Sequence, residues 1–290
     1  MTSGVEPLVE LLLVNAALQI TLFVFVACIP FLKTGRMSYV DIAWPFGVAV
    51  IGAVILLMGD GNVVRKTLVA GVYLMIGLRM GIGALTMARN TGVIFKTEFP
   101  RYEYRRMVME QAGEKHLRFH SLAEIMAQGF ANMSVLALPG FMLALNPSSS
   151  FSVWEVAGIV IWGLAYLTES TADVQKLRFI ANNKDNRLAV CNVGLWQYSR
   201  HPNYFAEWLV WTGLVVAAVP SWLALQAALP MAVWIVLGLG AVGASVMMYI
   251  TLVYLTGAVP AEYYSVRKRP EYATYQQKTN RFFPWFPKAG

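Results

Sequence analysis

A short polar stretch at residues 193–208, VGLWQYSRHPNYFAEW, runs directly into an apolar segment. Asn203 and Glu207 are four residues apart, so a helix places them on one face. Glu207 lies one turn inside the apolar run, where a charged side chain is costly and usually functional. We therefore expect a ligand to be bound by the polar groups of this stretch, at Tyr198, Arg200, His201, Asn203, Tyr204 and Glu207.

A second group of ionisable residues precedes that stretch, in LTESTADVQKLRF. Glu169, Asp173 and Lys176 are four and three residues apart and share one face of a helix. Two carboxylates at this position either contribute to a ligand site or brace neighbouring basic residues. The basic residues Lys176, Arg178 and Arg187 fit a ligand site and the bias of basic residues toward the cytoplasm equally well.

Charged residues at membrane depth also occur in the N-terminal half. Asp41 begins an apolar segment in SYVDIAWPFG, and Arg79 lies inside the next one. Asp41 has two interpretations, a buried functional acid or a carboxylate that is stabilised by the N-terminal end of its helix.

The composition indicates an integral membrane protein. The chain has 290 residues, of which 57% are apolar and 13% charged, and its mean hydropathy is +0.53. Soluble domains carry about 25% charged residues. The net charge of +7 records membrane topology rather than nucleic-acid binding, because no nucleic-acid-binding motif is present. We expect no nucleic-acid partner.

Seven apolar runs are long enough to cross a bilayer. They predict an all-α, polytopic fold in one helical membrane domain over residues 1–290, with a polar linker at 89–121 and a polar C-terminal tail. The runs cover residues 8–31, 39–59, 67–88, 122–145, 153–172, 203–224 and 230–257. Glu155 begins the fifth run and is expected at the membrane interface.

The basic residues predict the orientation of these spans. Twenty of the 23 Lys and Arg residues fall in the linkers after the first, third and fifth spans and in the tail. Because basic residues accumulate in cytoplasmic loops, the N-terminus is expected outside and the C-terminus in the cytoplasm. The tail is rich in Arg and Tyr, and it either lies on anionic lipid or folds over a cytoplasmic ligand.

Two sequence features, the GLGAVG segment and the three histidines, are not expected to form ligand sites. GLGAVG at 238–243 matches the glycine pattern of dinucleotide-binding folds, but it lies in a long apolar run with no strand before it. It is therefore interpreted as small residues that let helices pack closely. The three histidines lack metal-ligand spacing, so no metal site is expected.

The polar stretch resembles the signature of the membrane family that contains steroid 5α-reductases, sterol C14 reductases and their bacterial relatives, in GLWQYSRHPNYFAE. SYVDIAW resembles the bacterial branch in particular, which implies the bacterial inner membrane. The resemblance is strongest over about residues 165–285 and places the cofactor-binding half at about 165–290. It implies a multi-pass fold that binds NADPH among cytoplasmic loops and helix ends. It also implies hydride transfer to an activated C=C bond of a lipid-soluble enone, a 3-oxo-Δ4-steroid or a related isoprenoid.

The resemblance assigns residues to the cofactor and to the substrate. The expected cofactor-binding set adds the basic residues Arg178 and Arg187 to the positions that the resemblance implies and comprises Glu169, Asp173, Arg178, Arg187, Tyr198, Arg200, His201, Asn203, Tyr204, Glu207, Tyr264, Arg267 and Tyr272. Steroid 5α-reductases polarise the ketone with a Glu in the second helix and a Tyr in the third. The nearest candidates for these catalytic roles are Asp41, Tyr73 and Arg79. Ala206 also departs from the family, which has Gly at this position.

Three alternatives remain open at the level of sequence. The first is an S-adenosylmethionine-dependent methyltransferase of the isoprenylcysteine type, a family that shares an Arg-His-Pro-x-Tyr motif. The second is a non-catalytic lipid-binding protein that has this fold. The third is a transporter, which the clustering of polar groups at one face disfavours, because transporters bind substrates near the bilayer midplane.

Overall fold

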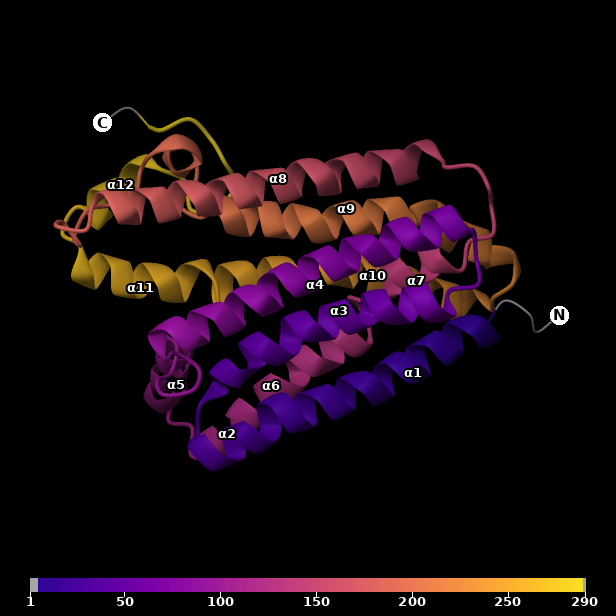
Figure 1. The fold of residues 1–290 in the computed structure, drawn as a ribbon, viewed down its shortest axis with the longest axis horizontal. Helices are drawn as coiled ribbons and strands as arrows, with labels where there is room; N and C mark the ends of the chain where they lie inside the picture. Colours follow the sequence, from indigo (N-terminus) through magenta and orange to yellow (C-terminus); the bar gives the residue numbers. More distant parts are fainter. Residues whose placement is uncertain (1–4, 289–290) are drawn as a thin grey trace. The chain divides into compact units, whose positions relative to one another are not determined.

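The chain is predominantly helical in the computed structural model, which describes residues 5–288 (Figure 1). Helices account for 77% of the chain, and no strand occurs in the described range. One isolated bridge joins Val93 to Thr97. The expected all-α class is therefore confirmed.

Six helical segments in the described part of the chain are long and apolar enough to cross a membrane. They are Glu6–Thr34, Met37–Met58, Val63–Thr91, Leu117–Ala144, Pro202–Ala227 and Met231–Lys268, and each overlaps one expected span. The seventh expected span, 153–172, falls in α8 (Val153–Asn182), which is 30 residues long but is not among the six. Its apolar stretch is interrupted by Glu155 and Glu169. A count of seven, the orientation of the termini and the bacterial inner membrane stay predictions.

The chain divides into two compact units, each made of two segments. Unit 1 consists of Met1–Gly158 and Leu214–Ala244, and unit 2 consists of Ile159–Gly213 and Ser245–Gly290. Three helices contribute residues to both units, namely α8, α9 (Pro202–Ala224) and α10 (Met231–Ile250). The single domain expected over residues 1–290 stays a prediction.

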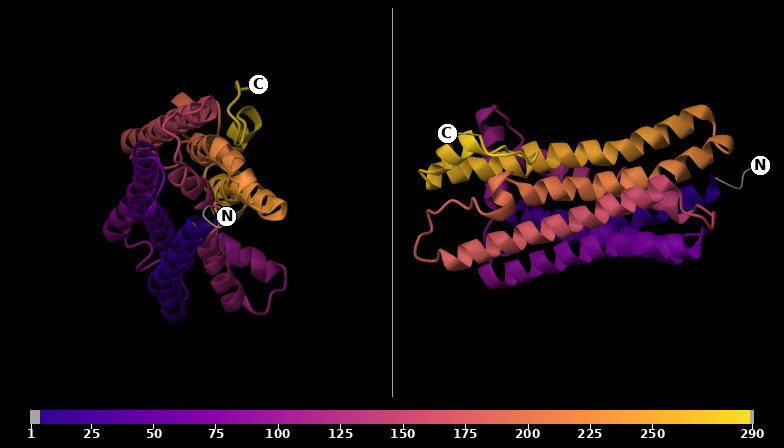
Figure 2. Two further views of the ribbon diagram at one scale, coloured as in Figure 1. Left: turned by 90° about the vertical axis from the view of Figure 1, so that its right-hand side faces the viewer. Right: turned by 90° about the horizontal axis from the view of Figure 1, so that it is seen from above.

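Unit 1 is a bundle of long helices. Its elements are α1 (Glu6–Phe23), η1 (Val24–Cys28), α2 (Ile29–Thr34), η2 (Met37–Tyr39), α3 (Val40–Met58), α4 (Val63–Thr91), α5 (Pro100–Gln111), α6 (Leu117–Met133) and α7 (Leu138–Ala144). Helices α1, α3, α4 and α6 run side by side, as two further views show (Figure 2). A Cβ on Gly77 of α4 would lie 2.4 Å from the Ala49 backbone nitrogen of α3, so glycine permits this close approach.

The GLGAVG segment lies within α10 and serves close packing in unit 1. A Cβ on Gly238 would lie 2.6 Å from the Trp222 ring, and a Cβ on Gly240 would lie 2.6 Å from a methyl group of Leu138. No strand precedes the segment in the described chain. These contacts agree with the interpretation of the glycines as packing residues.

Unit 2 contains shorter elements that surround the polar stretch. They are the C-terminal part of α8, η3 (Gly194–Gln197), the start of α9, η5 (Thr251–Leu255), α11 (Ala258–Lys268) and α12 (Tyr272–Lys278). Helix α12 packs against α11, and the chain then continues through Phe282 and Trp285 without regular structure.

A buried ion pair in unit 1 joins Arg65 of α4 to Glu155 of α8. The two side chains are 1% and 3% exposed, and Arg65 Nε donates to a carboxylate oxygen of Glu155. The remaining guanidinium N–H groups donate to the carbonyl oxygens of Asn146, Ser148 and Ser150 at 3.1, 2.6 and 2.7 Å. The carboxylate of Glu155 is enclosed by protein and neutralises a buried cation, and its expected position at the membrane interface stays a prediction.

The first prediction concerns this ion pair. Glu155→Gln is expected to reduce the free energy of unfolding by roughly 3 kcal/mol, because it leaves a buried guanidinium without its counter-ion. Unfolding of the detergent-solubilised protein by denaturant measures the loss. Glu124→Gln is the matched control, since Glu124 pairs with Arg105 while both side chains are about one-third exposed; a change below about 1 kcal/mol is expected there. Equal losses in the two variants would contradict the assignment.

Candidate ligand-binding site

The polar stretch forms a tight turn that leads into α9. Pro202 begins the helix, a position that suits proline because the first helical N–H groups have no partner within the helix. Ser199 Oγ accepts a hydrogen bond from the His201 backbone N–H (3.1 Å) and donates to the Phe282 carbonyl oxygen (2.9 Å). The turn is thus stabilised both locally and by the C-terminal segment.

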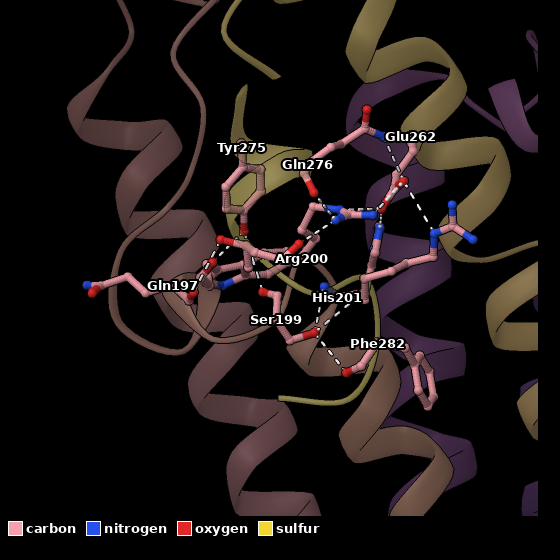
Figure 3. A network of polar contacts seen from close by, with 11 residues as sticks. Gln197, Ser199, Arg200, His201, Glu262, Tyr275, Gln276 and Phe282 are labelled. Carbon is pink, nitrogen blue, oxygen red and sulfur yellow. Dashed lines mark hydrogen bonds and ion pairs between the residues drawn. The ribbon is translucent and has the colours of Figure 1, made fainter. Parts of the chain in front are cut away.

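Glu262 of α11 is the centre of the polar network in this turn (Figure 3). Its two carboxylate oxygens accept hydrogen bonds from Arg200 Nε (2.7 Å) and Nη2 (3.1 Å). They also accept from His201 Nε2 (3.1 Å) and Gln276 Nε2 (2.8 Å), and Arg281 Nε lies 3.4 Å away. Glu262 is only 4% exposed. A buried carboxylate with this many donors is fully satisfied, as burial of a charge requires.

The Arg200 guanidinium donates four hydrogen bonds to protein atoms. Besides its two bonds to Glu262, its Nη1 donates to the carbonyl oxygens of Gln276 (2.9 Å) and Thr279. Its backbone N–H donates to the Asn280 carbonyl oxygen at 2.8 Å. Arg200 therefore fastens α11 and α12 to the turn rather than presenting a free cation.

Further bonds attach the C-terminal segment to the same turn. Tyr275 of α12 donates its phenolic hydrogen to the Trp196 carbonyl oxygen, and the Trp285 N–H donates to the Tyr198 carbonyl oxygen at 2.9 Å. Burial raises the pKa of the Tyr275 phenol, so the hydroxyl remains a donor at neutral pH. The tail is thereby packed against the motif that it follows by about 80 residues.

His201 is buried and neutral in this arrangement. Burial lowers the pKa of its imidazole, and the nearby charges of Arg200 and Lys176 lower it as well, whereas Glu262 acts in the opposite direction. Its Nε2 donates to Glu262, which places the single proton of the neutral ring on Nε2. The ring stacks on Tyr204, with ring centroids 5.2 Å apart and planes 3° from parallel.

A cavity of about 740 Å³ lies in unit 2 against this turn. It is lined by α8, the loop after it, the start of α9, and residues from α11 to α12. Five lining residues are basic and none is Asp or Glu; the five are Lys176, Lys184, Arg187, Arg200 and Arg269. The aromatic lining residues are Phe179, Trp196, Tyr204, Tyr272 and Tyr275. The cavity therefore attracts anions and offers flat surfaces on which a ring can stack.

Asn203 lines this cavity and is oriented by Asp173. Its Nδ2 donates to Asp173 Oδ1 at 3.1 Å, and because an ionised carboxylate only accepts, the amide orientation follows from this bond. The opposite atom, Asn203 Oδ1, is buried and has no hydrogen-bond partner among the described residues.

The structure brings six of the thirteen expected cofactor residues to the cavity, namely Arg187, Arg200, His201, Asn203, Tyr204 and Tyr272. The other seven do not line it, and they are Glu169, Asp173, Arg178, Tyr198, Glu207, Tyr264 and Arg267. Asp173 contributes indirectly by orienting Asn203, and Glu169 is buried in α8. Arg178 is exposed on the same helix.

The remaining residues of that group have other contacts. Glu207 Oε1 accepts from Trp211 Nε1 at 2.9 Å, so the carboxylate that holds Arg200 is Glu262 rather than Glu207. Arg267 folds back over the Tyr263 ring, with 3.4 Å between the guanidinium carbon and the ring centroid. Tyr198 packs its ring against Phe286 at 6.0 Å, and Tyr264 packs against Tyr263 at 5.1 Å.

The expected catalytic residues lie in unit 1. Asp41 Oδ1 accepts from Arg101 Nη2 (2.6 Å) and from the Tyr102 hydroxyl (3.1 Å), whereas its buried Oδ2 has no hydrogen-bond partner among the described residues. Tyr73 donates to the Leu136 carbonyl oxygen at 2.7 Å. It also accepts from the Gly140 N–H at 3.2 Å.

Arg79 is half-buried in α4. The catalytic roles of Asp41, Tyr73 and Arg79 stay predictions.

Some residues of the site were not predicted from the sequence. Glu262 and Arg269 have no motif that pairs them with the polar stretch, because their contacts depend on how the tail folds back. Trp196 lies in the polar stretch itself, but it has no ionisable group that would mark it as a site residue. Lys176 shares a helix face with Asp173, and that periodicity was the available signal.

These features define a multi-pass helical membrane protein with an anion-attracting cavity built around an Arg-His-Pro-Asn-Tyr turn. The chain belongs to the family described as "Protein of unknown function (DUF1295)", which it matches over residues 24–279. This family is associated with steroid 5α-reductase-like proteins. Neither the curated proteins nor the solved structures that were searched contain a match.

The second prediction concerns pH and His201. The unfolded chain takes up this proton at a pKa of about 6.5, and the folded protein takes it up only at lower pH. The stabilising contribution is therefore fully present above about pH 6.5 and is lost as the pH falls toward the lowered pKa of the folded state. His201→Gln should lack this part of the pH dependence in thermal unfolding, whereas His120→Gln, at an exposed histidine, should keep it. Identical profiles for wild type and His201→Gln would contradict the assignment.

Proposed function

We propose that the protein is a membrane-bound reductase that uses NADPH to reduce a C=C bond of a lipid-soluble enone. The observation that carries the proposal is the cavity in unit 2, with five basic lining residues, no carboxylate and five aromatic side chains. Its volume of about 740 Å³ lies within the usual range of ligand pockets, about 300–1,000 Å³. The bound reduced nicotinamide supplies the hydride.

The residues of the cavity fit a phosphorylated dinucleotide. Arg187, Lys184 and Arg269 are suited to phosphate groups, and Tyr204 and Tyr272 offer ring surfaces. Asn203 Oδ1 is suited to accept from a carboxamide or a ribose hydroxyl. Sites that select NADH commonly place a carboxylate at the ribose 2′-hydroxyl, whereas an arginine suits the 2′-phosphate of NADPH. The charge of the lining therefore supports NADPH.

The substrate half of the proposal rests on the family resemblance. Hydride addition to the β-carbon of an enone leaves negative charge on the enone oxygen, which a positioned donor or cation must stabilise. Asp41, Tyr73 and Arg79 are the proposed groups for this task. The lipid solubility of the substrate agrees with the membrane-spanning helices, which give the protein direct contact with lipid.

The charge of the cavity disfavours the methyltransferase alternative. S-adenosylmethionine carries a sulfonium and an ammonium group beside its carboxylate, and a lining without Asp or Glu offers no carboxylate to pair with either cation. A non-catalytic lipid-binding protein needs no such concentration of basic residues around a partly aromatic cavity. NADPH-dependent reduction is therefore the better-supported function.

The third prediction compares two arginines in binding experiments. NADPH should raise the melting temperature of the detergent-solubilised protein, since it binds the folded state. Arg187→Gln should weaken NADPH binding by roughly tenfold or more, the loss expected for a hydrogen bond to a charged group. The matched variant Arg178→Gln should bind NADPH like wild type, because Arg178 is exposed and does not line the cavity. Asn203→Ala should weaken NADPH and NADH binding to a similar extent.

Two outcomes of these binding experiments would contradict the proposal. Stabilisation by S-adenosylmethionine but not by NADPH would contradict the proposed function. Loss of NADPH binding in Arg178→Gln, with normal binding in Arg187→Gln, would place the dinucleotide outside the cavity.

A further inference from the structure

The chain after α12, residues 279–288, has no regular structure but is fastened to unit 2 through its backbone. The Trp285 N–H donates to the Tyr198 carbonyl oxygen, and the Lys288 N–H donates to the Lys278 carbonyl oxygen, both at 2.9 Å. The first bond attaches the segment to the polar turn, and the second attaches it to the end of α12. The side chains of this segment are therefore presented from a fixed backbone.

Three large aromatic side chains of this segment are exposed. Phe283, Trp285 and Phe286 are 52%, 68% and 73% exposed, whereas Phe282 is only 4% exposed. The rings of Trp285 and Phe286 contact each other, with centroids 6.3 Å apart. A single exposed apolar side chain is ordinary, but several exposed rings close together mark an interaction surface. We call these three residues the aromatic patch.

The aromatic patch begins beside two helices that are long and apolar enough to cross a membrane. The Phe283 ring centroid lies 5.8 Å from that of Trp208 in α9 and 6.1 Å from that of Tyr249 in α10. Trp208 is 19 residues from Ala227, where its membrane segment ends, and Tyr249 is 18 residues from Met231, where its own begins. Each distance along the helix is about 28 Å, close to the ~30 Å thickness of the hydrocarbon layer. Phe283 therefore lies where a spanning helix meets the headgroups, the level at which aromatic side chains gather.

The same part of the chain carries only positive charge. No Asp or Glu occurs from Tyr272 to Lys288, and the three basic residues Lys278, Arg281 and Lys288 are all exposed. Arg281 also lies 3.4 Å from Glu262, so the two lysines are the cations outside that network. None of the three lines the cavity of unit 2. Basic side chains at the surface of a bilayer attract anionic headgroups.

We propose that residues 278–288 form a binding surface for anionic phospholipid. The aromatic patch lies in the interfacial layer of the bilayer, and the ammonium groups of Lys278 and Lys288 pair with lipid phosphate groups. The backbone bond between these two lysines keeps them close together beside the patch. Because Trp285 is bonded to Tyr198, the lipid surface also supports the polar turn from outside. This inference does not depend on NADPH binding.

The first test measures the depth of the aromatic patch in a bilayer. The full chain, as Phe286→Cys with both native cysteines replaced by alanine, is spin-labelled in nanodiscs of phosphatidylcholine and phosphatidylglycerol. The label should collide more with oxygen than with a water-soluble nickel chelate. Asp185→Cys is the control, since it lies in the exposed loop after α8, and its label should show the reverse. Equal access of the chelate to both labels would overturn the proposal. Shielding of the Phe286→Cys label from both reagents would also overturn it, because protein would then cover the patch.

The second test measures the preference for an anionic headgroup. Phosphatidylglycerol or phosphatidylcholine is titrated into the detergent-solubilised chain, and bound lipid is counted by native mass spectrometry. The wild type should bind phosphatidylglycerol more tightly. Lys278→Gln/Lys288→Gln should weaken that binding by at least roughly fivefold, the factor expected for one lysine at an anionic surface, and should leave phosphatidylcholine binding unchanged.

The matched control removes two exposed lysines of unit 1. Lys96→Gln/Lys115→Gln changes the net charge by the same amount and should bind phosphatidylglycerol like wild type. Equal losses in the two double variants would overturn the assigned site. A wild-type chain that binds both lipids equally would overturn the assigned ligand class.

Discussion

The buried carboxylate of Glu262 is the interaction on which the arrangement of unit 2 depends. It accepts hydrogen bonds from Arg200 and His201 in the turn before α9, and from Gln276 in α12. Removing any one charge from such a cluster leaves another buried and unpaired, which is why buried networks of this kind are either complete or strongly destabilising. One side chain of α11 thus holds the turn and the tail in register.

The basic residues near the cavity are of two kinds, those that bond to Glu262 and those that do not. Arg200 and His201, the most recognisable residues of the motif, are engaged in internal bonds. Lys184, Arg187 and Arg269 line the same cavity without being part of the Glu262 network. The motif therefore builds the wall of the cavity, and less conspicuous residues in the loop after α8 and in the tail provide its positive charge.

The sequence predicted the helical class and the approximate positions of six spans, because apolar length and periodicity are local properties. It also predicted that the stretch around Asn203 would form a polar site. It did not predict the partner of Arg200, since Glu262 lies 62 positions away and no periodicity connects them. Glu207 was the nearer carboxylate, but it lies one helical turn from Trp211 and bonds to that ring. Local sequence patterns therefore could not predict the contacts between segments that are distant in the sequence.

The most direct test of the account is an experimental structure of the full chain with NADPH, determined in detergent or in a lipid nanodisc. The account predicts that the dinucleotide occupies the cavity of unit 2, with phosphate groups against Arg187 and Arg269 and with a ligand donor within hydrogen-bond distance of Asn203 Oδ1. Arg200 should remain bonded to Glu262 in that complex. Density for the dinucleotide outside this cavity, or against Arg178 and Arg267, would contradict the account.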